Sequence, residues 1–236
     1  MSGYKPYPFA GGLIYLDVDE SPHMRRRVEG TYEPHKVAAV QRLLRAGGTF
    51  VDVGANKGDF SLIAARTAGP EGRVIAFEPA PENAIWARKS VELNGYPSVE
   101  LLEIALSDSE GEARLHLGRK SGWHSLVPRP VEQDAITVRT RTLDAVLAER
   151  GSPTVDMLKI DVEGAELAVL RGARQTLAQE HGMWILLDVH PDFEVDPAEV
   201  AQVLHAQGFE LRSPEDPEQE LRDVPPETRE LFAFRA

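Results

Sequence analysis

Short apolar runs alternate with amphipathic stretches along most of this chain. The apolar runs have the length of strands and lie at residues 49–53, 73–77, 99–104, 155–160 and 184–189. Between and after them, apolar residues recur at helical spacing at residues 59–67, 81–94, 143–150, 166–180 and 198–207. Strands that alternate with helices of this length predict an α/β fold, a mostly parallel sheet with crossover helices on both faces.

One region between the third and fourth predicted strands departs from this alternation. Residues 107–142 contain two segments of alternating polarity, at 113–117 and 136–140, which have the period of strands. A stretch rich in Gly, Ser and Pro, residues 118–130, separates them. We therefore expect a β insertion that carries a long loop.

The two ends of the chain add further elements. Residues 209–212 and 231–235 are apolar segments joined by an acidic, Pro-rich connection, which predicts an antiparallel hairpin at the sheet edge. Residues 1–45 form an N-terminal extension with an amphipathic helix at 35–45. No stretch has the composition of a linker, so we expect residues 1–236 to form a single domain.

Charge and cysteine content exclude several functions. The 236 residues include 38 Asp and Glu against 26 Lys and Arg, a net charge of −12, which argues against nucleic acid as a partner. The basic run Arg25, Arg26 and Arg27 is expected to be a solvated face. Because the chain has no Cys, it has no thiolate nucleophile and no thiolate zinc site.

Nothing in the sequence predicts a membrane partner. The first residues lack the apolar core of a signal peptide, and no run of about 18 apolar residues occurs. We therefore expect a cytoplasmic protein. The sequence leaves the oligomeric state open and is compatible with a homo-oligomer.

The sharpest local motif is a glycine loop between the first strand and the first helix after it. It comprises Asp52, Gly54, Ala55, Asn56 and Gly58. In open α/β sheets such loops let the backbone approach a ligand, although they also serve simply to turn the chain. Asp52 lies inside an apolar strand, where a buried carboxylate needs a partner such as a cationic ligand or the loop amides.

The second strand ends in Phe77, Glu78 and Pro79, about twenty residues after the glycine loop. A carboxylate at this position is suited to accept hydrogen bonds from ribose hydroxyls. Asn56 stands where dinucleotide-binding loops need a second glycine, which disfavours a pyrophosphate and a nicotinamide oxidoreductase. The pattern better suits a nucleoside with a charged amino-acid tail, S-adenosyl-L-methionine.

Five motifs in order make the chain, from about residue 30 to 209, resemble the FkbM family of S-adenosylmethionine-dependent methyltransferases. They are FVDVGANKGDF at 50–60, AFEP at 76–79, ALSD at 105–108, TLD at 142–144 and LKIDVEGAE at 158–166. The resemblance implies a Rossmann-like class I methyltransferase fold with a seven-stranded sheet of order 3-2-1-4-5-7-6 and an antiparallel C-terminal strand. It also implies O-methylation of a hydroxyl on a sugar or secondary metabolite.

The resemblance assigns the cofactor site residue by residue. The glycine loop would surround the methionine part, Glu78 would hold the ribose hydroxyls, and Ala105 and Leu106 at the end of the third strand would border the adenine. Asp108 is either a site residue or part of a turn. The predicted cofactor-binding residues are Glu33, Asp52, Gly54, Ala55, Asn56, Gly58, Glu78, Pro79, Ala105, Leu106 and Asp161.

Methyl transfer to a hydroxyl needs a group that removes the acceptor's proton. The fourth and fifth strands end near Asp161, Glu163 and His190, which we predict as catalytic residues. Glu163 could equally complement the dipole at the start of the next helix. The family often has Glu before the His-Pro pair where this chain has Asp188, which leaves the role of that residue open.

Two other functions remain open from the sequence. Asp161, Asp188 and His190 could bind a divalent metal ion that acidifies the acceptor, although no local metal motif occurs and the leading prediction has no metal. The chain could also be a binding module that kept a methyltransferase fold without catalysis. Trp123 and His124, in the inserted loop, could cover the site. The acceptor, a small molecule or a glycan, stays unidentified.

Overall fold

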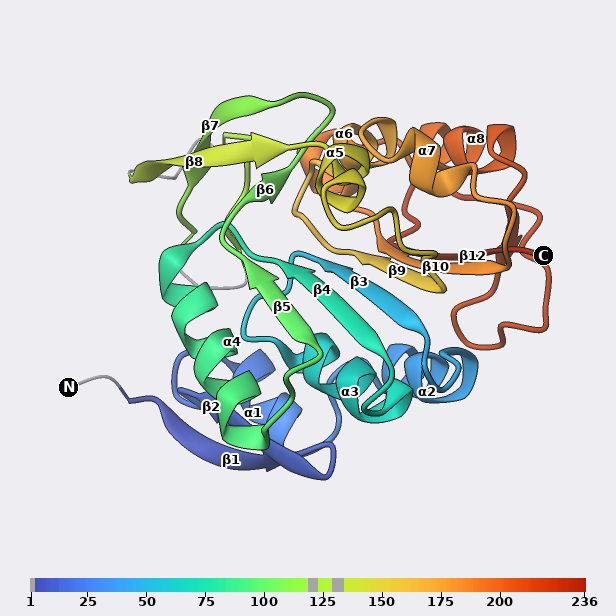
Figure 1. Ribbon diagram of the computed structural model, residues 1–236. Coiled ribbons are helices and arrows are strands. Elements are labelled where there is room, and N and C mark those ends of the chain that lie inside the picture. The colour runs from blue at the N-terminus through green and yellow to red at the C-terminus, as the bar shows by residue number, and fades with distance from the viewer. Residues whose placement is uncertain (1–2, 119–122, 129–133) are drawn as a thin grey trace.

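A seven-stranded sheet forms the centre of the computed structural model, which describes residues 3–118, 123–128 and 134–236 (Figure 1). Its strand order is β11-β12-β10-β9-β3-β4-β5. The strands are β3 (Thr49–Val53), β4 (Arg73–Phe77), β5 (Val99–Leu102), β9 (Met157–Ile160), β10 (Met183–Asp188), β11 (Glu210–Arg212) and β12 (Glu230–Arg235). Part of the Gly-, Ser- and Pro-rich stretch at 118–130 lies outside the described residues.

The strand directions confirm the predicted topology. β5, β4, β3, β9 and β10 pair in parallel, whereas β12 runs antiparallel to both β10 and β11. Numbered along the core strands, this is the order 3-2-1-4-5-7-6 with strand 7 antiparallel. β11 occupies the sheet edge and β12 lies inside the sheet, so the C-terminal hairpin spans the last two positions.

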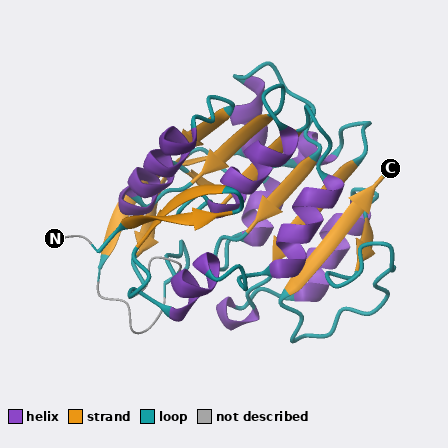
Figure 2. Cartoon of the chain, turned by 90° about the horizontal axis from the view of Figure 1, so that it is seen from below, coloured by secondary structure: helices purple, strands orange, loops and turns teal. Residues whose placement is uncertain are grey.

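Helices cover both faces of the sheet (Figures 1 and 2). The helices on one face are α2 (Pro34–Leu43), α3 (Asp59–Ala68) and α4 (Pro81–Asn94). Phe50 of β3 faces this layer and belongs to the hydrophobic cluster between the sheet and the helices α2 and α3. The next residue, Val51, belongs to the cluster of the opposite face. Its helices are α5 (Leu143–Ala148), α6 (Glu166–Arg171), α7 (Arg174–Leu177) and α8 (Pro197–Ala206). Adjacent strand residues therefore face opposite layers, as the two-residue period of a strand requires.

The predicted helix at 166–180 was wrong as a continuous element. It is divided into α6 and α7, which end and begin on either side of Gly172 and Ala173. The backbone of Gly172 packs against the carbonyl oxygen of Ser107, and a Cβ there would lie 2.1 Å from that oxygen. The insertion thus meets this layer at a point where only glycine fits.

The β insertion forms its own three-stranded sheet with the order β6-β8-β7. Its strands are β6 (Ala105–Leu106), β7 (Gly111–His116) and β8 (Ala135–Arg141). It begins two residues earlier than predicted, because Ala105 and Leu106 leave the third core strand at Leu102 and pair with Thr140 and Arg141. These two residues are therefore not at the end of the third strand but in the separate sheet.

The N-terminal segment contains more structure than the one predicted helix. A hairpin of β1 (Lys5–Phe9) and β2 (Gly12–Leu16) precedes α1 (Pro22–Val28) and α2. Its two turn residues, Ala10 and Gly11, have φ values of 47° and 80°, as a tight hairpin turn of this kind requires. Across the residues that the structure describes, no helix combines the length and apolar character needed to cross a membrane.

Candidate active site

Two adjoining cavities open where the parallel core strands end. The first is lined by both apolar and polar residues, as small-molecule sites usually are. Its lining includes Gly54, Asn56, Glu78, Pro79, Asn83, Ala105, Leu106, Leu115, His124, Asp161 and Glu163. The second cavity shares Asn56, Asp161 and Glu163 with the first and extends toward the N-terminal segment. The carboxyl ends of β3, β4 and β9 thus lie at the first cavity, and the end of β10 lies at the second.

The glycine loop is shaped by close packing as much as by ligand access. Gly54 has φ +80°, and a Cβ on it would lie 1.8 Å from the carbonyl oxygen of Asp161. The amides of Gly54 and Ala55 both donate to the carbonyl of Phe77, at 3.0 and 2.9 Å. Gly58 precedes α3 at φ +85°, against Ala87. Gly54 lines the first cavity, whereas Ala55 and Gly58 do not.

Glu78 is the buried carboxylate of the first cavity. It accepts hydrogen bonds from the amides of Asn56 at 2.7 Å and Ala80 at 2.9 Å, and it is only 5% exposed. Burial raises the pKa of Glu78 to about 7, although these two amides and nearby Lys57 favour the charged form. A carboxylate held in this way can bind donors in the cavity when it is ionised.

Asp52 does not line either cavity. It is fully buried, accepts a hydrogen bond from Ser61 Oγ at 2.6 Å, and lies 3.4 Å from Lys159 Nζ. Burial raises the pKa of Asp52, while Lys159 and Ser61 act in the opposite direction. Lys159 also donates to the carbonyl oxygen of Gly54 at 3.3 Å. Asp52 was predicted to contact a ligand. It instead contacts Lys159, which in turn holds the carbonyl of Gly54 in the glycine loop.

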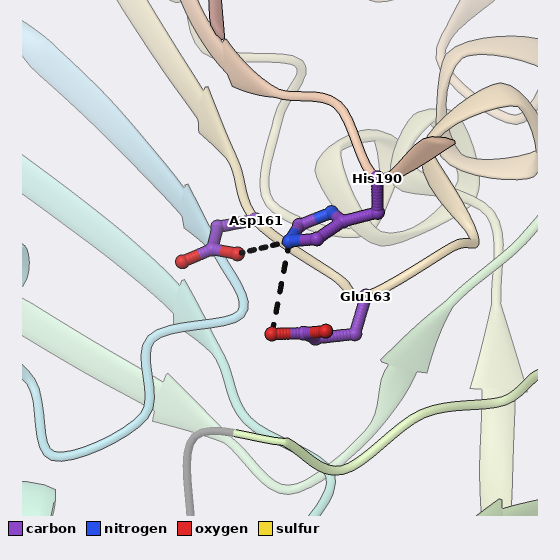
Figure 3. A group of neighbouring side chains, drawn as sticks. All are labelled: Asp161, Glu163 and His190. Atoms are coloured by element: carbon purple, nitrogen blue, oxygen red, sulfur yellow. Dashed lines mark ion pairs between the residues drawn. The ribbon is translucent and has the colours of Figure 1, made fainter. Parts of the chain in front are cut away.

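His190 lines the second cavity and has three carboxylates around it. Figure 3 shows its ring beside two of them, Asp161 and Glu163. Its Nδ1 is 2.5 Å from Glu166 Oε1, and its Nε2 lies 3.8 Å from Asp161 Oδ1 and 3.7 Å from Glu163 Oε1. Burial disfavours the charged ring, but the hydrogen bond to Glu166 and the other two carboxylates outweigh it and raise the pKa of His190 to about 9. The three residues predicted as catalytic are therefore neighbours, and Glu166 orients the imidazole.

Asp161 is one of the two carboxylates, with Glu163, that line both cavities. Burial opposes its ionisation, but the charges of Lys159, His190 and Lys36 outweigh this effect and lower the pKa of Asp161.

Glu163 adopts φ +51°, an uncommon conformation for a residue other than glycine, and its carbonyl accepts a hydrogen bond of 2.5 Å from Ser125 Oγ. The inserted loop is thereby attached to the end of β9.

Lys36 explains the positions of Asp188 and Glu33. Its side chain is 1% exposed, and its Nζ lies 2.7 Å from both carboxylate oxygens of Asp188 and 2.7 Å from Glu33 Oε2. Glu230 Oε1 is 3.2 Å away. Glu33 and Asp188 line the second cavity and not the first, so Glu33 lies on the side of His190 and away from Glu78.

Sequence reasoning missed several residues of the second cavity. Arg27 was expected on a solvated face, but it is 5% exposed because Asp59 accepts a hydrogen bond from its Nε at 2.8 Å. Tyr32 lies against its guanidinium group. Trp123 lines the second cavity and His124 the first, while Asp108 lines neither. The sequence near Arg27 gives no signal for its burial, because Asp59, the carboxylate that such a burial needs, lies 32 residues away on α3.

The sheet order, the glycine loop and the carboxylate after the second strand define the class I methyltransferases. The chain belongs to the FkbM methyltransferase family, since the family model "Methyltransferase FkbM domain" matches residues 52–211. It is 30% identical over 248 residues to the 31-O-demethyl-FK506 methyltransferase FkbM of Streptomyces tacrolimicus, with 89% of this chain and 90% of the relative covered. It is therefore a methyltransferase, and the family implies S-adenosylmethionine as the cosubstrate.

Other relatives differ in how much of their length this chain spans. The 2-O-methyltransferase NoeI of Sinorhizobium fredii is 27% identical over 177 residues, covering 66% of this chain and 72% of the relative. The AMB antimetabolite synthetase AmbE of Pseudomonas aeruginosa is 33% identical over 209 residues, 70% of this chain but only 10% of the relative. The crystal structure of a methyltransferase FkbM from Methylobacillus flagellatus, 14% identical with a TM-score of 0.51, covers 90% of this chain and 52% of that one and shares its fold.

The first cavity fits the cosubstrate that the family implies. Glu78 is a buried acceptor suited to the two ribose hydroxyls. The apolar side chains of Ala105, Leu106 and Leu115 form a wall against which an adenine ring can pack. Glu78, Pro79, Ala105, Leu106, Gly54, Asn56 and Asp161 are the predicted cofactor residues that line this cavity, and Glu33, Asp52, Ala55 and Gly58 are those that do not.

Proposed function

We propose that this protein transfers the methyl group of S-adenosylmethionine to a hydroxyl of a sugar or secondary metabolite. The adenosine binds in the first cavity, with the ribose hydroxyls on Glu78 and the adenine beside Ala105 and Leu106. The acceptor binds in the second cavity beside His190. The observation that carries this assignment is the wall common to both cavities, Asn56, Asp161 and Glu163, where the methyl donor and the acceptor would meet.

His190 is the group best suited to remove the acceptor's proton. When bound, S-adenosylmethionine supplies a methyl group that is already activated on a sulfonium, so the protein needs mainly to orient the acceptor and take its proton. With Nδ1 hydrogen-bonded to Glu166, His190 in its neutral form has its lone pair on Nε2, which faces the shared wall. Asp161, whose pKa is lowered, is a weaker base and remains negative beside a cationic donor.

Two observations support an oxygen acceptor with several hydroxyls. The second cavity is lined by polar groups from separate elements, Ser21, Tyr32, Glu33 and Asp188 among them, and by the indole of Trp123, which is 40% exposed. Polar groups around an exposed ring suit a sugar or a polyhydroxylated metabolite. The names of NoeI and of the S. tacrolimicus FkbM specify O-methylation by those proteins.

Transfer of a radiolabelled methyl group to a panel of acceptors tests this function. We expect labelled product from hydroxylated sugars or polyketide alcohols, and no turnover of amines of similar size. Labelling of amines alone would contradict O-methylation. Absence of turnover together with absence of S-adenosylhomocysteine binding in calorimetry would contradict the assignment of the first cavity.

A metal-assisted reaction is the second candidate, and one cluster favours it. Asp161, Glu163 and His190 each place one ligand atom within 4.8 Å of the other two. Among the described residues, Asp188 is not part of this cluster. Both of its carboxylate oxygens instead accept hydrogen bonds from Lys36 Nζ. A divalent ion here would bind and acidify the acceptor hydroxyl.

Removal of metal ions separates the two candidates. Because His190 supplies a base without a metal, we expect the turnover of protein dialysed against EDTA to stay within about twofold of the untreated value. A loss of more than about tenfold that Mg²⁺ or Mn²⁺ restores would instead favour the metal-assisted reaction. The control is protein dialysed without chelator.

A further inference from the structure

Arg27 is a buried cationic residue at the edge of the second cavity. It lies on α1 and is 5% exposed, yet it lines this cavity. Its Nε donates to Asp59 Oδ2 at 2.8 Å, and its guanidinium carbon lies 3.7 Å from the centre of the Tyr32 ring. Among the residues that the structure describes, no carboxylate pairs with its terminal nitrogens, and Nη1 lies 4.0 Å from the sulfur of Met24. Asp59 and Tyr32 thus fix the group and leave its outer edge available.

No other Lys or Arg among the described residues lines either cavity. The nearby Lys36 and Lys159 are 1% and 3% exposed and are held by carboxylates. Lys57, fully buried, donates to Asn83 Oδ1 at 2.6 Å. Carboxylates, in contrast, line both cavities. A ligand that carries an anionic group at this end of the site therefore finds one arginine to pair with.

S-adenosylmethionine carries such a group at the end of its methionine part. Asn56 connects the two ends of the site, because its backbone amide donates to Glu78 in the first cavity and the residue also lines the second cavity, where Arg27 lies. A ligand whose ribose rests on Glu78 can extend past Asn56 into this cavity. Arginine pairs with carboxylates through parallel hydrogen bonds, which Asp59 leaves possible because it occupies only Nε.

We propose that Arg27 binds the carboxylate of the methionine part of S-adenosylmethionine. The proposal rests on the proposed function, which locates the adenosine in the first cavity. Arg27 precedes residues 52–211, the region that matches the family model, so the N-terminal segment would complete the cofactor site.

Calorimetry with S-adenosylhomocysteine and its decarboxylated analogue tests this role. We expect the wild-type protein to bind S-adenosylhomocysteine about 30-fold more tightly than the analogue, a ratio in the range of a charged hydrogen-bonded pair. Arg27→Gln should remove most of this preference by weakening only the carboxylate ligand, and Arg27→Lys should retain part of it. Arg26→Gln, on the same helix but exposed, is the matched control and should retain the full preference.

Three outcomes would overturn the proposal. They are a wild-type protein that binds both ligands equally, an Arg27→Gln variant that loses affinity for both to the same extent, and a variant that changes only the KM of the acceptor. The first measurement needs no variant, so a misfolded Arg27→Gln protein does not prevent the test. Failure of the wild-type protein to bind either ligand would contradict the proposed function instead.

Discussion

Replacement of His190 by Gln is expected to lower kcat by about 10² to 10⁴, the usual contribution of a general base. The affinity for S-adenosylhomocysteine should stay within about threefold, because His190 lies outside the first cavity and is assigned to the acceptor rather than to the ribose, the adenine or the methionine carboxylate. Glutamine keeps a hydrogen-bonding group near Glu166 but has no atom that can accept the acceptor's proton. Single-turnover assays at saturating cosubstrate, with calorimetry on the same variant, measure the two effects separately.

The pH dependence of the reaction should report the same residue. The carboxylates around His190 raise its pKa to about 9 in the absence of ligands, so the ring is charged at neutral pH and its Nε2 cannot accept a proton. A cationic sulfonium nearby disfavours the charged ring, which moves this pKa downward in the complex. The rate should therefore rise with pH, with a midpoint below 9. His190→Gln should show no such rise.

His205→Gln is the matched control for His190. His205 lies on α8 and its Nδ1 contacts the carbonyl of Phe209, away from both cavities. Its replacement should leave kcat and the pH profile unchanged. An unchanged kcat in His190→Gln, or an equal loss in both variants, would contradict the role of His190 as the base.

Replacement of Glu78 by Gln is expected to raise the Kd of S-adenosylmethionine by about 100-fold. Two ribose hydroxyls donate to one carboxylate in this proposal, and hydrogen bonds to charged groups contribute about 1.5 to 3 kcal/mol each. Glutamine offers one acceptor and leaves its amide donors facing the hydroxyls and the Asn56 amide. Calorimetry or a thermal-shift titration with the cosubstrate measures the change.

The affinity of the wild-type protein should depend on pH through the same group. Burial raises the pKa of Glu78 to about 7, and only the ionised form accepts both hydroxyls. Binding is therefore strongest above pH 7 and weakens as the pH falls below this value, because the ligand must then displace a proton. Glu78→Gln should have a weak affinity that does not change across this range.

Glu82→Gln provides the control, because Glu82 is an exposed residue in the first turn of α4, four positions after Glu78. Its affinity for the cosubstrate should match that of the wild-type protein, including the decline at low pH. If Glu78→Gln bound as tightly as the wild-type protein, the ribose would not rest on Glu78. If both variants weakened binding equally, the effect would be one of overall charge.

The sequence was sufficient to predict the core of the fold. β3 and β4 have the predicted bounds because their apolar runs are short and end at a glycine and at Glu78. The carboxyl ends of parallel strands share one edge of a sheet, so the meeting of Glu78, Asp161 and His190 near one site followed from topology alone. The sequence therefore allowed us to predict which side chains lie at the carboxyl ends of the strands.

The sequence was less informative about pairs that are distant along the chain. Nothing local indicates that Lys36 would meet Asp188, 152 residues away, or that Arg27 would be buried against Asp59. Asp52 was recognised as a carboxylate in need of a partner, but Lys159 and Ser61 meet that need, and no ligand is required. Burial of a charge is decided by such long-range partners, which hydrophobic patterns do not record.

The crystal structure of the protein with S-adenosylhomocysteine tests the central claim most directly. We predict the ribose hydroxyls on the Glu78 carboxylate, the adenine against Ala105 and Leu106, and the thioether sulfur at the wall formed by Asn56, Asp161 and Glu163. The sulfur would then face the cavity that contains His190. Binding of the ligand outside the first cavity, or with its sulfur away from this wall, would contradict the account.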